Sequence, residues 1–327
     1  DLDGDGWLDL VVADHCKGVL VFRGDGGTTW VEDSRGIPRN LEGFNDADVG
    51  DVDGDGRLDI VAVSGFSRGF LVLQGQADGS WRVVPNTGLP ETGGGFELSL
   101  MDINDDTRLD VIVTFNLMSS DRRGEPLPPA KVWLQTADGR FRPATGFTDE
   151  GRFFGVARGV PRPDTGQELL FSLVGARAGI RAFHSQNGLE WTEYGRIDEA
   201  TFGTYPGGFV GLDTADIDGD GCTDLVTTDG KRMGIWMALG DCQGGWTFCP
   251  AETFPVGESL APGWGVATGD LNGDGRTDVV AAFGLANTGG LKAWLQADPA
   301  LDISVNQGHG PDALRPSRGF GEPVPAP

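Results

Sequence analysis

The chain has 327 residues, and its 54 glycines and 19 prolines favour many short strands and tight turns over helices. A formal net charge of −24 argues against nucleic acid as a partner, because phosphate binding needs a basic surface. No apolar run approaches the ~20 residues that a membrane-spanning helix needs, which argues against membrane insertion by this segment.

An acidic nine-residue loop opens the chain and recurs four times. Its copies are DLDGDGWLD (1–9), DVDGDGRLD (51–59), DINDDTRLD (102–110), DIDGDGCTD (216–224) and DLNGDGRTD (270–278). Carboxylates at positions 1, 3, 5 and 9, with the backbone carbonyl of position 7, supply the hard oxygen ligands that Ca²⁺ prefers. In the second copy these ligands are Asp51, Asp53, Asp55, the carbonyl of Arg57, and Asp59. No His or Cys recurs at the ligand positions, so a transition-metal site fits poorly.

The residues after each copy distinguish it from an EF-hand loop, which begins in the same way. An EF-hand needs an acidic residue at position 12 and a helix on each side. Position 12 here is Val12, Ala62, Val113, Thr227 and Ala281. Each copy continues into a short β-branched run such as LDIVAVS (58–64), which predicts a buried strand. We therefore expect the acidic loop to join two strands.

The copies define a repeat of about 50 residues. The intervals between first positions are 50, 51, 114 and 54 residues, and the third interval equals two periods. A sixth, degenerate unit is therefore expected near residue 160, in FFGVARGVPRPDTGQELLFSLV (153–174). It keeps Asp164 and Glu168 but has Val160 and Arg162 where ligands should stand, so we expect it to hold no metal.

Each unit predicts four strands, which we name A to D. Strand A precedes the acidic loop, as in 47–52 and 265–271, and strand B follows it. Strand C comes next, as in GVLVFRG (18–24) and AKVWLQT (130–136). Strand D opens with an aromatic residue, at Trp30, Trp81, Phe141, Trp191 and Trp246, and the late position of Phe141 indicates an insertion in the third unit. A second aromatic precedes the loop at Phe44, Phe96, Phe153 or Phe154, Phe209 and Trp264. We interpret the strand D aromatics as core packing, with a carbohydrate platform as the alternative.

Repeated four-stranded antiparallel units predict an all-β fold, a β-propeller, because each repeat buries its faces only against its neighbours. We expect a single domain over residues 1–327 with six blades, at about 1–43, 44–95, 96–151, 152–207, 208–262 and 263–327. The first unit lacks strand A and the tail RGFGEPVPAP (318–327) resembles a strand D with its following loop, so we expect a six- or seven-bladed ring cut at both ends. Residues 299–319 fit no element of the repeat.

The motif DxDGDGxxD before an apolar strand, at this spacing, resembles the FG-GAP and VCBS repeats of integrin α-chain-like propellers. The resemblance covers nearly the whole chain. It implies one Ca²⁺ in the A–B loop of each intact blade, six to eight blades, and a secreted or cell-surface location. Proteins of this kind are mostly adhesion, ligand-binding or scaffold modules, and some are attached to enzymes.

By this resemblance, up to five sites would bind Ca²⁺. The side-chain ligands would be Asp1, Asp3, Asp5 and Asp9; Asp51, Asp53, Asp55 and Asp59; Asp102, Asn104, Asp106 and Asp110; Asp216, Asp218, Asp220 and Asp224; and Asp270, Asn272, Asp274 and Asp278. Position 7 would add its carbonyl, as at Arg57, Cys222 and Arg276. Thr107 replaces the turn glycine and Asn104 a carboxylate, so we expect the third site to be weaker. The terminal ammonium of Asp1 puts the first site in doubt.

A stabilising role is the simplest one for the metal, since Ca²⁺ neutralises clustered carboxylates. In a propeller the A–B loops lie on one face, so the B–C loops are free on the opposite face. Those loops carry His15 and Lys17, Arg68, Arg122 and Arg123, Arg177, and Lys231 and Arg232. We expect this positive rim to bind an anionic partner, either an acidic glycan or a carboxylate-bearing protein segment. The competing interpretation is that exposed hairpin turns often carry Lys or Arg.

An enzyme is the alternative class of function, as the propeller domain of a secreted polysaccharide lyase or hydrolase. Such a site needs a positioned acid, base or nucleophile. The chain has only His15, His184 and His309 as histidines, and it contains neither GxSxG nor HExxH. We therefore expect no catalytic residue in this segment.

The four cysteines are too few for a disulfide scaffold. Cys242 and Cys249 flank a predicted hairpin turn and could bridge it. Cys222 could pair with either of them, and Cys16 lies far away in sequence. The sequence leaves the pairing open.

Overall fold

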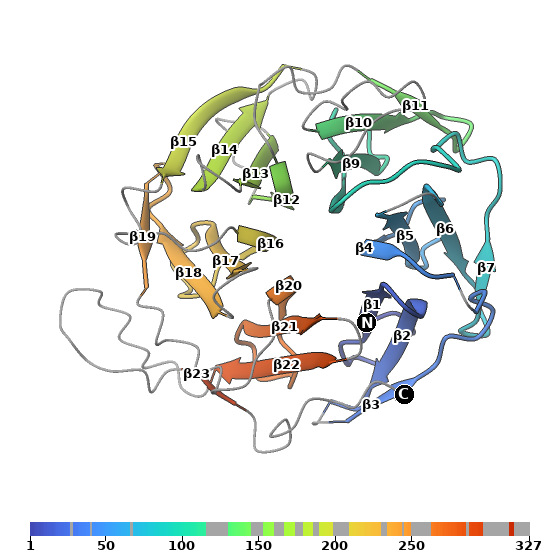
Figure 1. Cartoon of the computed structure of the whole chain (residues 1–327), viewed down its shortest axis with the longest axis horizontal. Helices are drawn as coiled ribbons and strands as arrows, with labels where there is room; N and C mark the ends of the chain where they lie inside the picture. Colours follow the sequence, from blue (N-terminus) through green and yellow to red (C-terminus); the bar gives the residue numbers. More distant parts are fainter. Residues whose placement is uncertain are drawn as a thin grey trace. The chain divides into compact units, whose positions relative to one another are not determined.

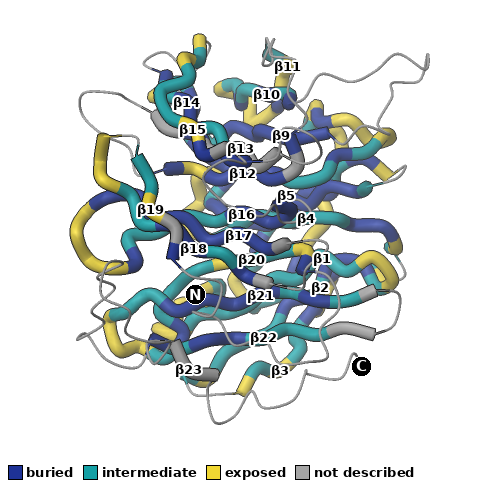
Figure 2. The backbone as a smooth tube through the Cα atoms, turned by 60° about the vertical axis from the view of Figure 1, so that its left-hand side comes forward, coloured by how far each residue is buried: buried dark blue, intermediate teal, exposed yellow. Residues whose placement is uncertain are grey.

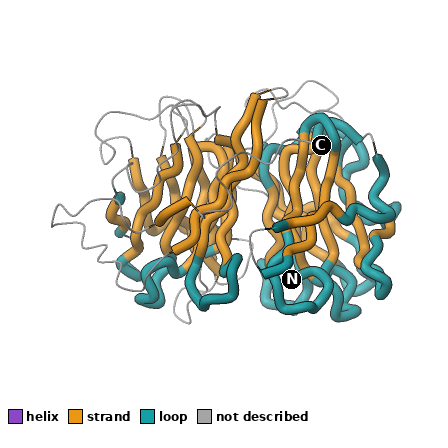
Figure 3. The backbone as a smooth tube through the Cα atoms, turned by 90° about the horizontal axis from the view of Figure 1, so that it is seen from below, coloured by secondary structure: helices purple, strands orange, loops and turns teal. Residues whose placement is uncertain are grey.

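The fold is all-β. The computed structural model describes residues 1–26, 29–39, 41–65, 68–115, 130–144, 153–159, 167–173, 179–185, 190–198, 209–229, 234–243, 245–249, 263–285, 288–296 and 314–316. Within these ranges the chain forms strands, turns and loops and contains no helix (Figure 3). Accordingly, no helix of the described residues is long and apolar enough to cross a membrane.

Six antiparallel sheets follow one another along the chain (Figure 1). The first has three strands, β1 (Leu10–Asp14), β2 (Gly18–Gly24) and β3 (Trp30–Glu32). The next two have four each: β4 (Phe44–Gly50), β5 (Asp59–Ser64), β6 (Phe70–Gly75) and β7 (Trp81–Val83), then β8 (Leu98–Met101), β9 (Asp110–Thr114), β10 (Ala130–Gln135) and β11 (Phe141–Pro143).

The remaining three sheets also have four strands each. They are β12 (Phe153–Arg158), β13 (Gln167–Leu173), β14 (Gly179–Ser185) and β15 (Thr192–Asp198); β16 (Phe209–Ala215), β17 (Asp224–Asp229), β18 (Gly234–Gly240) and β19 (Trp246–Phe248); and β20 (Gly263–Gly269), β21 (Asp278–Leu285), β22 (Thr288–Gln296) and β23 (Leu314–Pro316). Strand order within each sheet follows the sequence. The fold is therefore that of a β-propeller, with five four-stranded sheets as blades.

The predicted strands are confirmed in this arrangement. Strand C has its predicted position in all six sheets, as β2, β6, β10, β14, β18 and β22. The degenerate unit has its two expected strands as β12 and β13, and Asp164 between them lies outside the described residues. The unassigned stretch 299–319 contains β23, which pairs with β22. The fourth strand of the last sheet is therefore Leu314–Pro316, not the tail 318–327 in which we expected it.

The chain divides into two compact units. One contains Asp1–Asp25, Trp30–Val156 and Ser185–Trp191, and the other contains Gly26–Thr29, Ala157–His184 and Thr192–Pro327. The first unit therefore holds the sheets β1–β3, β4–β7 and β8–β11. The second holds β16–β19, β20–β23 and most of β12–β15.

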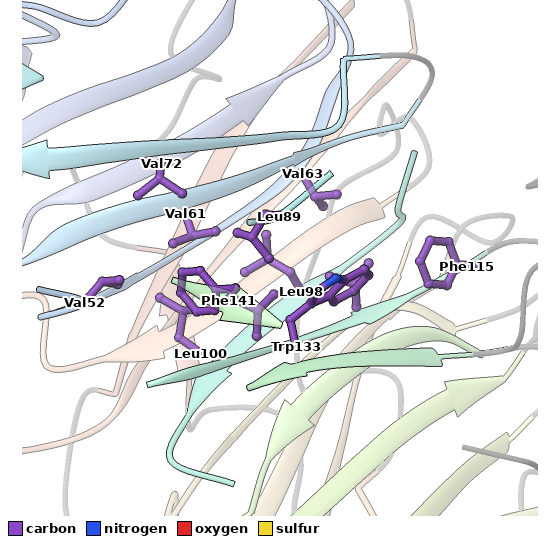
Figure 4. Packing of buried hydrophobic residues seen from close by; sticks show 12 residues of the cluster. Val52, Val61, Val63, Val72, Leu89, Leu98, Leu100, Phe115, Trp133 and Phe141 are labelled. Carbon is purple, nitrogen blue, oxygen red and sulfur yellow. The ribbon is translucent and has the colours of Figure 1, made fainter. Parts of the chain in front are cut away.

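The hydrophobic cores lie between consecutive sheets. In the first unit, Val61, Val63 and Val72 pack against Leu98 and Trp133 of the next sheet, in a cluster of twelve buried residues (Figure 4). In the second unit, Val226 and Met237 pack in the same way against Val279 and Trp294. Each fully buried Val or Leu side chain contributes about 1.5–3 kcal/mol relative to an exposed one. Sheets that bury apolar side chains against their neighbours hold the acidic loops at fixed positions.

Strand B is fully buried in the second and third sheets. Every residue of β5 and of β9 is buried (Figure 2). This agrees with the continuous β-branched runs in the sequence, because a strand covered on both faces needs no polar alternation. Since the acidic loop leads directly into strand B, the carboxylate at position 9 of the loop lies at the edge of the core.

Candidate metal centres in the acidic loops

The acidic loops connect strands A and B, as predicted. The loop at 51–58 joins β4 to β5, and the register Gly50↔Asp59 closes it into a tight turn. Positions 4 and 6 have positive φ, for example 75° at Gly54 and 84° at Gly56. Glycine adopts this conformation without strain because it has no Cβ. The third loop has the same conformation with Asp105 at φ 59° and Thr107 at φ 68°.

The position 1 carboxylate organises the turn. In all five loops its Oδ2 accepts a hydrogen bond from the amide of position 6, at 2.6–2.9 Å. At position 5, Oδ1 accepts the amide of position 7 in all five loops, at 2.7–3.0 Å. The Thr107 amide makes the same bond as its glycine counterparts. The five segments are therefore copies of one loop in three dimensions as well as in sequence.

The position 9 carboxylate connects the loop to strand C of its own sheet. Its Oδ2 accepts the amide of position 2 at 2.7–3.1 Å in all five loops. Its Oδ1 accepts the amide of a residue at the end of strand C at 2.7–2.9 Å, and these residues are Gly24, Gly75, Gln135, Gly240 and Gln296. Sequence reasoning predicted position 9 as a metal ligand and did not foresee this second role.

Burial has an electrostatic consequence at position 9. It raises the pKa of Asp59, Asp110, Asp224 and Asp278 to about 6, although backbone hydrogen bonds favour the ionised form. Neighbouring carboxylates of the same loop contribute to this rise in pKa, as Asp53 does for Asp59. A cation bound among these groups would favour their ionised forms.

Three loops bring carboxylates close enough to share one ion. Ligand atoms of three acidic residues lie within 4.8 Å of one another at Asp1, Asp3 and Asp5; at Asp51, Asp53 and Asp59; and at Asp216, Asp218 and Asp224. The other two loops have an asparagine at position 3, Asn104 or Asn272. The acidic clusters could therefore hold a metal ion, and their donors are oxygen atoms, the class that Ca²⁺ prefers.

The position 7 side chain fastens the loop to the end of strand C. Arg57 donates from Nε to the Gly75 carbonyl at 3.0 Å, and its guanidinium also pairs with Asp55. Arg108 and Arg276 do the same with the carbonyls of Gln135 and Gln296, at 3.1 and 2.9 Å.

A disulfide makes the corresponding connection in the fourth intact loop. There Cys222 stands at position 7 and is bonded to Cys242 in the turn after β18. This resolves the pairing that the sequence left open, while Cys16 and Cys249 are free thiols. The Cys222 carbonyl, which we predicted as a ligand, therefore belongs to a residue that is covalently fixed.

Neighbouring sheets within a unit meet at the loops. The Gln135 side chain donates to the carbonyl of Val52, the position 2 residue of the preceding loop, at 2.8 Å. In the second unit Gln296 makes the same contact with Ile217 at 3.3 Å. A change of loop conformation would therefore alter a hydrogen bond to the next sheet.

Carboxylates on strand A were missed by sequence reasoning. Asp46 and Asp48 of β4 accept the amides of Leu98 and Leu100 of the next sheet, both at 2.8 Å. In the second unit Asp213 of β16 accepts the Thr268 amide at 2.6 Å. The alternation of acidic residues in FNDADVG (44–50) was the available signal. These acids connect sheets and are not part of the acidic loops.

The predicted aromatics take the expected positions. Strands β3, β7, β11 and β19 begin with Trp30, Trp81, Phe141 and Trp246, and Trp191 directly precedes β15. Trp81 and Phe141 are buried in the cores, which supports packing over a carbohydrate platform. The indole N–H groups of Trp30 and Trp246 donate to the carbonyl of loop position 8, each at 3.2 Å. Trp264 departs from the pattern because it is 43% exposed.

Only part of the predicted cationic rim lies within the residues that the structure describes. His15 and Lys17 lie in the turn between β1 and β2, and Arg68 lies between β5 and β6 with its side chain exposed. Arg122, Arg123, Arg177, Lys231 and Arg232 lie outside the described residues. Of the histidines, His184 packs against the ring of Tyr194, with centroids 5.4 Å apart, and His309 is outside the described ranges.

Comparison with known proteins identifies the repeat. A family model described as an FG-GAP-like repeat matches residues 1–62, 51–113 and 216–281. These matches begin at the first, second and fourth intact loops. Among curated protein sequences, none matches the chain significantly.

Solved structures with similar folds have low sequence identity. A protein from Lactobacillus plantarum is 13% identical with a TM-score of 0.56, over 89% of this chain and 79% of that one. A Bacillus licheniformis rhamnogalacturonan lyase is 14% identical with a TM-score of 0.42, over 88% of this chain and 53% of the lyase. The chain thus spans about half the length of that lyase. Only the first likeness is close enough to support the shared fold.

Proposed function

The chain belongs to the FG-GAP-like repeat family, and from this premise we propose that it is an extracellular binding or scaffold module whose blades are stabilised by Ca²⁺. The observation that carries the proposal is the fivefold repetition of one acidic loop, with three carboxylates within 4.8 Å in three copies. Hydrogen bonds of the turn do not by themselves require these acids to converge, and their convergence is electrostatically unfavourable unless a cation lies among them. Oxygen donors favour Ca²⁺ over transition metals.

The stabilising effect follows from the electrostatics of the loops. Without a cation, each loop holds three or four carboxyl groups side by side in a chain of net charge −24. Bound Ca²⁺ supplies positive charge that offsets their repulsion. Binding only to the folded state adds about 2.7 kcal/mol per site when free calcium is one hundred times the dissociation constant. The position 9 carboxylate would extend this stabilisation to strand C, through the hydrogen bonds that it accepts from backbone amides there.

We further propose that the three-stranded sheet is a sixth blade. Its strands β1, β2 and β3 correspond to strands B, C and D, and its acidic loop has the same hydrogen bonds as the others. Val19 and Val21 of this sheet pack in one cluster with Ile60 and Leu73 of the next. It thus behaves as a blade that lacks strand A.

An extracellular location is supported by the disulfide. Cys222 and Cys242 are bonded across the loop of one blade, and disulfides persist mainly in oxidising compartments. Calcium sites of modest affinity also suit extracellular calcium concentrations.

A ligand would bind at the B–C turns, opposite the acidic loops. In the sheet β4–β7, the register Val63↔Phe70 places the B–C turn at the other end of the sheet from the loop at Asp51. Lys17 and Arg68 lie in such turns, and Arg122, Arg123, Arg177, Lys231 and Arg232 follow the same sequence pattern. We propose an anionic partner, a protein segment or an acidic glycan.

Calcium titration with thermal melting tests the proposal. We expect Ca²⁺ to raise the melting temperature and a chelator to lower it, with more than one ion bound per chain. Replacing Asp51 and Asp53 with Asn should remove one bound ion, whereas Asp78→Asn, at an exposed turn of the same sheet, should leave the stoichiometry unchanged. An unchanged melting temperature with no bound ion would contradict the proposal.

The ligand face needs a separate test. The variant with Lys17, Arg68, Arg122, Arg177 and Arg232 replaced by Ala should lose binding to acidic polysaccharides or acidic peptides. The matched control replaces Arg35 and Arg142, which are exposed away from the B–C turns. Equal binding by both variants would remove the cationic face from the proposal and leave the calcium role intact.

A further inference from the structure

The five acidic loops differ in one neighbouring side chain. In each of their sheets, one residue near the end of strand C donates its amide to the position 9 carboxylate. The residues that directly precede these donors are Arg23, Gln74, Leu134, Leu239 and Leu295. Only the first loop therefore has a cation at this place. This side chain lies beside the loop, since Gln74 in the second sheet reaches Asp53.

Arg23 contacts the predicted metal ligands directly. Its Nη1 donates to Oδ2 of Asp9 at 2.9 Å, and its Nε lies 3.8 Å from Oδ2 of Asp3. The side chain of Arg23 is 13% exposed and that of Asp9 is 1% exposed. This ion pair is therefore largely shielded from solvent, where charge interactions are stronger than at the surface.

The guanidinium is held in place from other directions. Its Nη2 donates to the Gly79 carbonyl of the next sheet at 3.3 Å. Its central carbon lies 6.0 Å from the ring centre of Trp81, within the range of a cation–π contact. An arginine fixed by a carboxylate, a carbonyl and an indole cannot move away from the loop without losing all three.

The carboxylate cluster of the first loop is correspondingly different. The second and fourth intact loops cluster positions 1, 3 and 9, as Asp51, Asp53 and Asp59 do. The first loop clusters positions 1, 3 and 5, and Asp9 is absent from its cluster. Asp9 is the residue that Arg23 binds.

We propose that Arg23 is a built-in cation of the first loop, which neutralises Asp9 and Asp3 without calcium and makes this loop the weakest calcium site with a full set of four aspartates. An ion that shared Asp3 with the guanidinium would be repelled by it. We expect the calcium affinity of the first loop to be lower than that of the loop at Asp216, which has four aspartates and no arginine at position 7, by on the order of tenfold or more. This inference rests on the proposed calcium role.

Trp7 allows the first loop to be measured alone. It occupies position 7, where the other intact loops have Arg or Cys. Terbium binds calcium sites and emits when a nearby tryptophan is excited. The part of the terbium emission that is lost in Trp7→Leu therefore reports the first loop. Calcium titrated against this signal gives the affinity of that loop.

The decisive comparison uses Arg23→Gln, which reproduces the residue of the second sheet. We expect its Trp7-dependent signal to saturate at terbium concentrations at least tenfold lower than in the wild type. Arg23→Lys keeps the charge and should resemble the wild type. Arg39→Gln, which removes an exposed cation that pairs with Glu32 of β3, is the control and should have no effect.

If Arg23→Gln does not fold, Arg23→Leu takes its place, because leucine stands at this position in three of the other sheets, and its Trp7-dependent signal should also saturate at a lower terbium concentration than in the wild type. Equal affinities in either comparison would overturn the inference, as would an Arg23→Gln loop that still binds no terbium. Absence of calcium binding at every loop would instead contradict the proposed function.

Discussion

Position 6 of the acidic loop requires a positive φ in all five copies. Gly6, Gly56, Gly221 and Gly275 have φ between 82° and 94°, and a Cβ added to any of them would meet nothing within 4 Å. Space is therefore available, and glycine is required only by the backbone conformation. Thr107 adopts φ 68° with a β-branched side chain, which is costly in the left-handed region.

We predict that Thr107→Gly stabilises the chain by about 1 kcal/mol. The physical reason is relief of strain at an unchanged hydrogen bond from this amide to Asp102. Chemical denaturation with and without Ca²⁺ measures the gain. The reciprocal change Gly56→Thr should destabilise by a similar amount, and a Thr107→Gly variant less stable than the wild type would contradict the strain argument.

Carboxylates on strand A connect one sheet to the next, because they accept hydrogen bonds from backbone amides of the neighbouring sheet. Asp48 accepts the amide of Leu100 at 2.8 Å, and Asp46 accepts that of Leu98. These amides lie on the edge strand β8, which has no strand partner on that side within its sheet. An edge that is satisfied by side chains is closed to further strand pairing.

Asp48→Ala should lower the free energy of unfolding by about 1.5–3 kcal/mol, since a hydrogen bond to a charged acceptor is lost and an amide is left without it. Asp48→Asn keeps an acceptor oxygen and should lose less. Urea denaturation of the two variants measures both effects. If alanine and asparagine were equally harmless, the carboxylate would not be holding the two sheets together.

The disulfide is a second connection between elements, since it joins an acidic loop to the turn after a strand. Cys222 and Cys242 are 20 residues apart and connect the acidic loop to the turn after β18, where three other sheets use the arginine at position 7. Closing a loop of this length restricts the unfolded chain and stabilises the fold by about 3 kcal/mol in the chain-entropy view.

A variant with Cys222 and Cys242 both replaced by Ser should therefore melt at a lower temperature under oxidising conditions. Its calcium affinity at Asp216, Asp218 and Asp224 should also fall, because the loop is less constrained. Thermal melting and calcium titration measure the two effects. Cys16→Ser, at an exposed free thiol, serves as the control. A double variant that melts with the wild type would show that the bond is dispensable.

Charge governs behaviour at the scale of the whole molecule. The net charge of −24 opposes compaction by self-repulsion, and much of it is concentrated in the acidic loops. Bound calcium would reduce this repulsion, and dissolved salt screens it, since the Debye length falls from about 10 Å at 0.1 M to about 3 Å at 1 M.

We predict that sodium chloride raises the melting temperature of the calcium-free chain more than that of the calcium-loaded chain. The experiment records melting curves over a range of sodium chloride concentrations, once with chelator and once with saturating calcium. Parallel salt dependences in the two series would mean that the loops are not the main source of repulsion.

The sequence by itself determined the repeat, the strands and the loop chemistry. These features are local: the spacing of aspartates and the β-branched runs after them occupy consecutive residues, so propensity and periodicity reveal them. Family membership follows from the same pattern. The aromatic residues of strand D could be placed because they recur at a nearly constant distance from the loops.

Only the tertiary structure decided how those pieces connect. The pairing of Cys222 with Cys242, the anchoring of position 9 to strand C, and the carboxylate contacts of Asp48 join residues 15 to 52 positions apart. Nothing in the sequence distinguishes Arg23 from other polar residues of the predicted strands. Its contact with Asp9 exists because β2 lies beside the first loop. Such contacts depend on which strand ends meet in space, which no local pattern encodes.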